Sequence, residues 1–189
     1  IIKPLEEVRS RETIKGFFNY PIQDSARNKD PEKYRKDADA LREAINHTTD
    51  PFLLSRYTFY LAQCCKDSGQ LNTAVEVYLN VPALQGWTEE KYISLLTAGR
   101  LMRNEQVTRK DVLNCFFRAL DYSMDRAEAL YEIMMVLKGE NRLYAAYIFG
   151  KEALKKVKKV DALFLENWIY DYSLAYEMSV IAWYANDKE

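Results

Sequence analysis

The sequence predicts an all-α protein, built as a right-handed α-α superhelix of antiparallel helix hairpins. Six glycines and five prolines among 189 residues are too few for the many turns of a β-sandwich or a barrel. Apolar residues recur at helical spacing along most of the chain. A small or β-branched residue recurs on alternate predicted helices, with separations of 36, 38 and 34 residues, at Ala38, Ala74, Val112 and Ala146. A period in this range is typical of an array of helical hairpins.

Two regions are predicted. Residues 1–28 carry Pro4, Gly16 and Pro21 among short apolar stretches. We expect an extended lead-in there, with at most one short strand, that is either independent or the end of an upstream domain. Residues 29–189 are expected to form the helical domain. Because the chain begins at Ile1 and not at methionine, it is treated as a piece of a longer protein.

The first predicted helix begins at Asp30-Pro31, because Asp accepts hydrogen bonds from the first free amides and proline is tolerated at the first helical position. It ends near Thr48-Thr49, and Asp50-Pro51 starts the next helix in the same way. Gly69 is expected to end one helix and Pro82 another. Three pairs and one long last helix are predicted to follow, at 52–67 and 71–81, 88–103 and 108–121, 126–138 and 141–157, and 163–185.

Charge and cysteine usage limit the environment and the partners. The 27 basic and 28 acidic side chains create no overall field that selects nucleic acid or an anionic membrane. The three cysteines are odd in number, and two of them are adjacent, which argues against a disulfide framework. We expect buried, reduced thiols in a cytoplasmic protein at Cys64, Cys65 and Cys115. No apolar run approaches the ~20 residues of a membrane-spanning helix, and no signal peptide is predicted.

The segment from Arg56 to Tyr78 resembles a tetratricopeptide (TPR) repeat. Leu61-Ala62 matches the Leu-small pair of the first helix of such a repeat, and Gly69 its turn glycine. Ala74 and Tyr78 match the small residue and the aromatic residue of the second helix. Later repeats depart from this pattern, with a longer turn around residues 105–108, Met134 at a small position and Gly150 at the aromatic one.

The order of several motifs resembles a more particular setting. It is similar to the helical-repeat region that follows the catalytic domain in certain bacterial family 2 glycosyltransferases. The motifs that carry this resemblance are the segments Ala26 to Tyr34, Ser55 to Gln63, Gly86 to Glu90, Met124 to Tyr131 and Trp168 to Tyr172. The resemblance implies a helical accessory region whose catalytic partner lies outside this chain.

The chain itself offers no convincing active site. Asp37-Ala38-Asp39 spells the Asp-x-Asp triplet that holds a metal in nucleotide-sugar transferases, but residues two apart in a helix point about 200° away from each other. His47 is the only histidine and lies at a predicted helix end, where a dipole contact is expected. Glu89-Glu90 is interpreted as helix capping. We therefore expect no metal and no cofactor.

The TPR resemblance implies a concave groove lined by the first helix of each hairpin. The first hairpin contributes Arg56, Phe59, Gln63 and Lys66, the second Glu90, Ile93, Thr97 and Arg100, and the third Tyr131, Met135 and Lys138. This mixture suits an extended peptide or a carboxylate. The Lys-Asn clamp of chaperone-binding TPR domains is absent. The alternative is that these residues face a neighbouring domain or water.

Charge in this groove leads to a specific expectation. Glu90 is the one carboxylate predicted near Arg56, Lys66 and Arg100, so an acidic partner is expected to balance the cations. Reversing Arg56 and Arg100 to Glu is then expected to weaken binding and to leave the thermal melt nearly unchanged. The lysine-rich segment from Lys151 to Lys159 is predicted to be a solvated helix end, with an acidic partner as the alternative.

The leading hypothesis is a non-catalytic interaction or assembly module, the accessory region of a bacterial glycosyltransferase. The first alternative is a stand-alone TPR-type peptide-binding adaptor, and the second is a helical enzyme whose site is not recognised. The expected partner is a protein or peptide, with an upstream glycosyltransferase domain as one option. Homo-oligomerisation remains open, and neither nucleic acid nor a transmembrane segment is expected.

Overall fold

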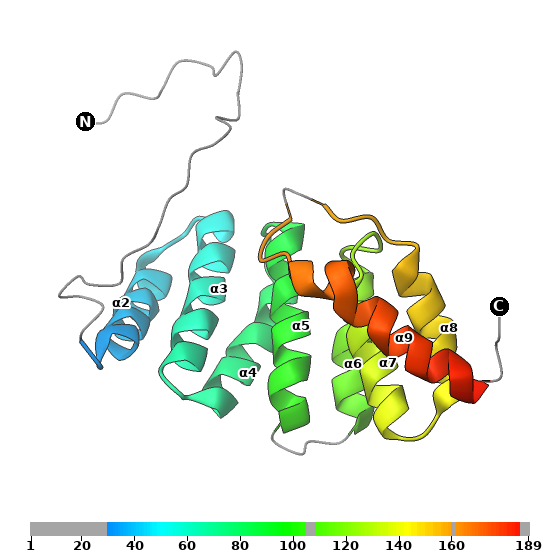
Figure 1. The fold of residues 1–189 in the computed structure, drawn as a ribbon. Coiled ribbons are helices and arrows are strands. Elements are labelled where there is room, and N and C mark those ends of the chain that lie inside the picture. Colours follow the sequence, from blue (N-terminus) through cyan, green and yellow to red (C-terminus); the bar gives the residue numbers. More distant parts are fainter. Residues whose placement is uncertain (1–29, 105–108, 160–161, 186–189) are drawn as a thin grey trace, which may run out of the picture. The chain divides into compact units, whose positions relative to one another are not determined.

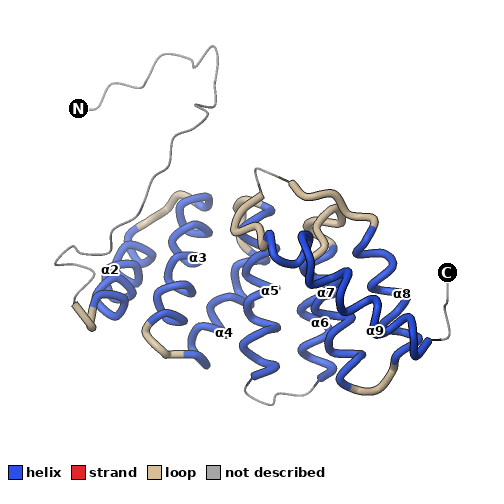
Figure 2. The backbone as a smooth tube through the Cα atoms, viewed as in Figure 1, coloured by secondary structure: helices blue, strands red, loops and turns tan. Residues whose placement is uncertain are grey.

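The computed structural model describes residues 30–104, 109–159 and 162–185, and these residues are helical with connecting turns and no β-strand (Figures 1 and 2). The predicted all-α class is confirmed. The expected lead-in at residues 1–28 lies outside the described residues. The chain divides into two units, Ile1–Lys33 and Tyr34–Glu189, and the architecture below is that of the second.

Eight α-helices account for most of the described residues. They are α2 (Lys33–His47), α3 (Pro51–Asp67), α4 (Leu71–Asn80), α5 (Thr88–Asn104), α6 (Arg109–Leu120), α7 (Glu128–Gly139), α8 (Leu143–Leu154) and α9 (Leu174–Ala185). A 3₁₀ turn, η1 (Val81–Ala83), follows α4, and a π-helical turn, η2 (Ile169–Ser173), precedes α9.

Local signals set the ends of α3. A side-chain oxygen of Asp50 accepts hydrogen bonds from the amides of Phe52 and Leu53, at 2.8 and 3.2 Å. Pro51 occupies the start of the helix, where its missing amide has no cost. Beyond the other end, Gly69 has a φ of 78°, a left-handed conformation that glycine adopts without strain. The predicted start and stop signals are confirmed here.

Consecutive helices pack against each other in chain order. The pairs α3 with α4, α5 with α6 and α7 with α8 make the most extensive contacts, and α9 packs on α8 (Figure 1). The four recurring positions of the sequence pattern, Ala38, Ala74, Val112 and Ala146, all lie in the core. The pattern therefore marks positions where helices approach closely.

The two departures from the repeat pattern in the third hairpin compensate for each other. A Cβ atom added to Gly150 on α8 would lie 2.7 Å from the sulfur of Met134 on α7, and it would also collide with Met178 on α9. The large Met134 thus fills the space that an aromatic residue at position 150 would occupy. This exchange of volume keeps the packing dense.

The last predicted helix, 163–185, is wrong in its first part. Residues 162–166 are turn and irregular structure, helical backbone begins at Asn167, and α9 begins at Leu174 after the π-helical turn η2. Phe164 has a φ of 49°, which no α-helix accommodates. The backbone of Leu163 bonds to the side chains of Glu89 and Arg126, so its polar groups are satisfied without a helix. The helix predicted at 141–157 also ends early, at Leu154.

Cysteine placement agrees with the prediction of reduced thiols. Cys65 and Cys115 are buried, Cys64 is partly buried, and none of the three forms a disulfide bond. Burial raises the pKa of Cys65 and of Cys115, which favours the inert thiol form. Among the helices that the structure describes, none combines the length and the apolar character that crossing a membrane requires.

Candidate functional site: the face formed by α3, α5 and α7

Five of the predicted groove residues, Gln63, Lys66, Ile93, Thr97 and Arg100, line one pocket. Gln63 and Lys66 of α3 lie opposite Thr97 and Arg100 of α5, around a volume of about 270 Å³. Phe164 and Glu166, from the turns before α9, form part of the wall, and the apolar part of the α5 lining is Ile93 and Leu96. Helices α3 and α5 therefore share one pocket.

Phe59 is not open to this pocket. Its side chain is buried, and its ring packs edge-to-face with Tyr78 of α4. The ring of Phe164 stacks over it, with ring centres 6.5 Å apart and planes inclined by 24°. The residue predicted to meet a ligand is thus covered by a residue of the same chain.

The C-terminal part of the chain also covers the third predicted hairpin. The Tyr131 hydroxyl lies 2.9 Å from the Ser173 hydroxyl, and the Tyr131 ring packs edge-to-face against Trp168 at 5.6 Å between ring centres. Lys138 forms an ion pair with Glu177 of α9. Tyr131 is buried and Met135 is partly buried. Tyr131 and Lys138 therefore contact residues 168–177.

The expectation that Glu90 is the only nearby carboxylate is wrong. Arg100 donates from Nε to Glu132 at 2.6 Å, and from both terminal nitrogens to Glu166, one of these contacts measuring 3.0 Å. Lys66 lies 3.3 Å from Asp67 and donates to Gln63 at 3.2 Å. Glu132 directly follows Tyr131 in α7, and Glu166 lies outside any helix, so the helical pattern did not assign either to the groove.

Glu90 is a deeply buried carboxylate. Its Oε1 accepts from Arg56 at 3.2 Å, while its Oε2 has no hydrogen-bond partner among the described residues. Burial raises the pKa of Glu90, and the nearby Arg56 opposes this effect only in part. The capping interpretation of Glu89-Glu90 is incomplete, because both side chains make long-range contacts.

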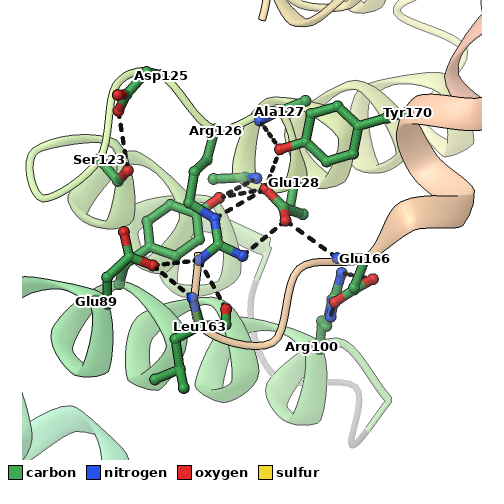
Figure 3. A network of polar contacts seen from close by, with 12 residues as sticks. Glu89, Arg100, Ser123, Asp125, Arg126, Ala127, Glu128, Leu163, Glu166 and Tyr170 are labelled. Atoms are coloured by element: carbon green, nitrogen blue, oxygen red, sulfur yellow. Dashed lines mark hydrogen bonds and ion pairs between the residues drawn. The ribbon is translucent and has the colours of Figure 1, made fainter. Parts of the chain in front are cut away.

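A buried polar cluster fastens the same C-terminal residues to the helices (Figure 3). The Arg126 side chain has no exposed surface. It donates to Glu128 at 2.7 and 3.2 Å, to Glu89 at 2.6 Å and to the Leu163 carbonyl at 2.9 Å. Its guanidinium also lies 4.4 Å from the ring centre of Tyr92. Arg126 thus joins α5, the start of α7 and the turn at residue 163.

Glu128 completes this cluster from the other side. Its carboxylate accepts from the Tyr170 hydroxyl at 2.8 Å, and the Tyr170 oxygen accepts from the Ala127 amide at 3.0 Å. Burial by itself raises the pKa of Glu128, but the hydrogen bond and the charge of Arg126 outweigh it and leave that pKa below its usual value. The carboxylate is therefore held ionised.

The sequence pattern did not reveal this cluster as a structural centre. In the sequence, Arg126 and Glu128 stood out only as members of the motif Met124 to Tyr131. The available signal was the pair of opposite charges at the start of a strongly apolar stretch, because ionised side chains enter a core only when they are paired.

The remaining candidates are solvent-facing or already paired. Asp39 of the Asp-x-Asp triplet pairs with Arg42 at 2.7 Å on an exposed surface. Within the described ranges, no three His, Cys, Asp or Glu side chains gather closely enough to hold a metal ion. In the lysine-rich segment, every lysine from 155 to 159 pairs with a carboxylate, as Lys155 and Lys156 with Glu152, Lys158 with Asp171, and Lys159 with Asp125.

The described residues define an all-helical protein in which Phe164 and Glu166 form part of the wall of the pocket between α3 and α5. No protein-family model matches the chain, and no curated protein matches it either. The TPR and glycosyltransferase resemblances therefore rest on the sequence motifs alone.

Proposed function

We propose that the chain is a non-catalytic helical-repeat module for protein interaction or assembly, with its hairpins arranged as a TPR-like right-handed superhelix. The observation that carries this proposal is the shared pocket of Gln63, Lys66, Thr97 and Arg100. Equivalent helices of successive hairpins contribute matching positions to one surface. That is the arrangement in which repeat proteins bind extended partners.

The chemistry of the pocket supports a peptide ligand. The pocket offers hydrogen-bond donors and acceptors that fit a peptide main chain. They are the amide of Gln63, the ammonium of Lys66 and the hydroxyl of Thr97. Ile93 and Leu96 provide an apolar floor beside them. The cations are balanced by carboxylates of the chain itself, so the partner need not be strongly acidic.

The motif resemblance further supports a place beside a bacterial family 2 glycosyltransferase domain, in assembly or in presentation of the acceptor. A stand-alone peptide-binding adaptor is the alternative. The reading frame of the parent gene distinguishes the accessory role from the stand-alone adaptor. The accessory role requires a strand-rich domain with a strand-end Asp-x-Asp motif upstream of Ile1.

An immobilised peptide library tests the interaction role. The purified chain is applied to the library beside a double variant, Gln63→Ala with Lys66→Ala. The control is Lys155→Ala, which removes a lysine that is 70% exposed and lies outside the pocket. We expect peptides that retain the native chain and the control but lose the double variant. Retention that is equal for all three proteins, or absent for all three, would contradict the proposal.

Self-association is a second candidate, favoured by an aromatic surface at the α9 end of the chain. Four side chains there are 63–72% exposed, namely Tyr172, Tyr176, Trp183 and Tyr184. Exposed apolar surface of this kind often marks an interaction site, and a second copy of the chain is a fitting cover for it. Light scattering should give a dimer mass that Trp183→Asp reduces and that Tyr144→Asp, on exposed α8 surface, leaves unchanged.

A further inference from the structure

We propose that residues 163–168, called the strap below, are an intramolecular ligand of the face formed by α3, α5 and α7. A partner protein would bind this face by exchanging its own segment for the strap. The partner segment carries an aromatic residue, a carboxylate two positions later and a second aromatic residue two positions after that. This inference rests on the proposed interaction role and specifies the partner for it.

The side chains of the strap occupy the face as a bound peptide does. Phe164 stacks on Phe59 of α3, and Glu166 makes a two-pronged contact with Arg100 of α5. Trp168 packs against Tyr131 of α7. Three alternate residues of one segment thus engage three successive first helices. The strap is not an extended segment, because Leu163 and Phe164 form a turn and Asn167 and Trp168 are helical, so an incoming segment has to adopt the same bends.

In the part of the strap before the helix, the main chain at Leu163 and Glu166 is bonded to buried side chains. The Leu163 amide donates to Glu89 at 3.2 Å, and the Leu163 carbonyl accepts from Arg126 at 2.9 Å. The Glu166 amide lies 3.5 Å from a Glu128 oxygen, at the outer limit of a hydrogen bond. Main-chain groups are common to all peptides, so an incoming segment would find the same partners.

The strap is less firmly seated than the helices beneath it. Phe164 holds a left-handed backbone conformation that a bulky residue rarely adopts, and such strain persists only where the surroundings enforce it. Its side chain is 57% exposed, although its ring stacks on a buried one. The pocket of about 270 Å³ lies directly beside Phe164 and Glu166, so an incoming segment has room to begin contact there.

Amide hydrogen exchange on the unmodified chain gives the first test. If the strap opens while the helices stay folded, the Leu163 and Glu166 amides exchange roughly a hundredfold faster than the Ile133 amide in α7. Equal exchange of all three amides would mean that the strap is released only by global unfolding. That result would overturn the proposal.

A peptide titration gives the second test. The probe is a fluorescent peptide copy of residues 162–170, followed by anisotropy. The tethered strap competes at a high effective concentration, so binding to the native chain is expected to be weak. The variant Phe164→Gly with Glu166→Gln should bind the peptide at least about tenfold more tightly. A peptide with Lys at the position of Glu166 should bind neither protein.

Matched controls separate the outcomes. Tyr144→Ala, on the exposed surface of α8, should bind the peptide as weakly as the native chain does. Phe164→Gly alone keeps the ion pairs of Arg100 with Glu132 and Glu166. This single variant replaces the double variant if circular dichroism shows that the double variant is unfolded. Absence of peptide binding to a folded strap variant overturns the inference. Formation of a dimer by that variant without peptide would identify a second copy as the source of the segment. In either case, peptide-library binding that depends on Gln63 and Lys66 would still support the proposed interaction role.

Discussion

Arg126 and Glu128 lie two residues apart, have no exposed side-chain surface, and are joined by hydrogen bonds of 2.7 and 3.2 Å. Each also binds the C-terminal residues, Arg126 through the Leu163 carbonyl and Glu128 through the Tyr170 hydroxyl. The pair is therefore the point at which the last part of the chain is fixed to the helices. Its chemistry leads to the first prediction.

Removing one partner of this pair should destabilise the fold strongly. Arg126→Met leaves the Glu128 carboxylate buried without its counter-ion, which typically costs about 3–5 kcal/mol. Urea denaturation measures this loss. Arg142→Met serves as the control, because Arg142 is 60% exposed in its pair with Glu140 and should cost about 1 kcal/mol or less. Equal effects of the two substitutions would contradict the structural role of Arg126.

The two buried carboxylates should respond to pH in opposite directions. The pKa of Glu90 is raised in the folded chain, so its favourable contribution is present at low pH and is lost as the pH rises through that pKa. The pKa of Glu128 is lowered, so its contribution is present at neutral pH and is lost as the pH falls through that pKa. Glu90→Gln should therefore gain stability relative to the native chain as the pH rises.

Glu128→Gln should show the reverse trend in the same experiment. Thermal melts of the native chain and both variants, on either side of the usual glutamate pKa of 4.5, make the comparison. Parallel pH trends for the two variants would contradict the environments described here.

The close contact at Ala74 should not tolerate a larger side chain. Ala74 is fully buried in the hairpin of α3 and α4, so Ala74→Leu forces extra atoms into a packed contact, at a cost of about 1–3 kcal/mol. Asn72→Ala, on the exposed side of the same helix, should change stability little. The melting temperatures of the two variants test this, and similar shifts would mean that the repeat register is wrong.

Reversal of Arg100 should destabilise the chain, contrary to the sequence-based expectation of an unchanged melt. Arg100→Glu would place a third carboxylate beside Glu132 and Glu166 and would remove the cation that both of them bind. The melting temperature should fall clearly. Arg103→Glu is a useful comparison, because Arg103 also pairs with Glu132 but is 42% exposed, and its reversal should have a smaller effect.

The helical spacing of apolar residues predicted most of the helices, because this spacing indicates which face of each helix is buried. The expectation that Gln63, Lys66, Thr97 and Arg100 share a groove came from the TPR resemblance, and the four residues line one pocket. Helical spacing did not predict the strap, because residue type does not reveal the left-handed backbone conformation of Phe164. The ion pairs of Arg100 join residues 32 and 66 positions away, and no local period encodes such distances.

The most direct test of the interaction role is calorimetric titration of the tightest peptide from the library. We predict binding to the native chain and to Lys155→Ala with similar dissociation constants. The double variant Gln63→Ala with Lys66→Ala should bind at least about tenfold more weakly, which corresponds to a loss of about 1.4 kcal/mol. Equal affinity for all three proteins, with their melts unchanged, would contradict a binding role for the pocket between α3 and α5.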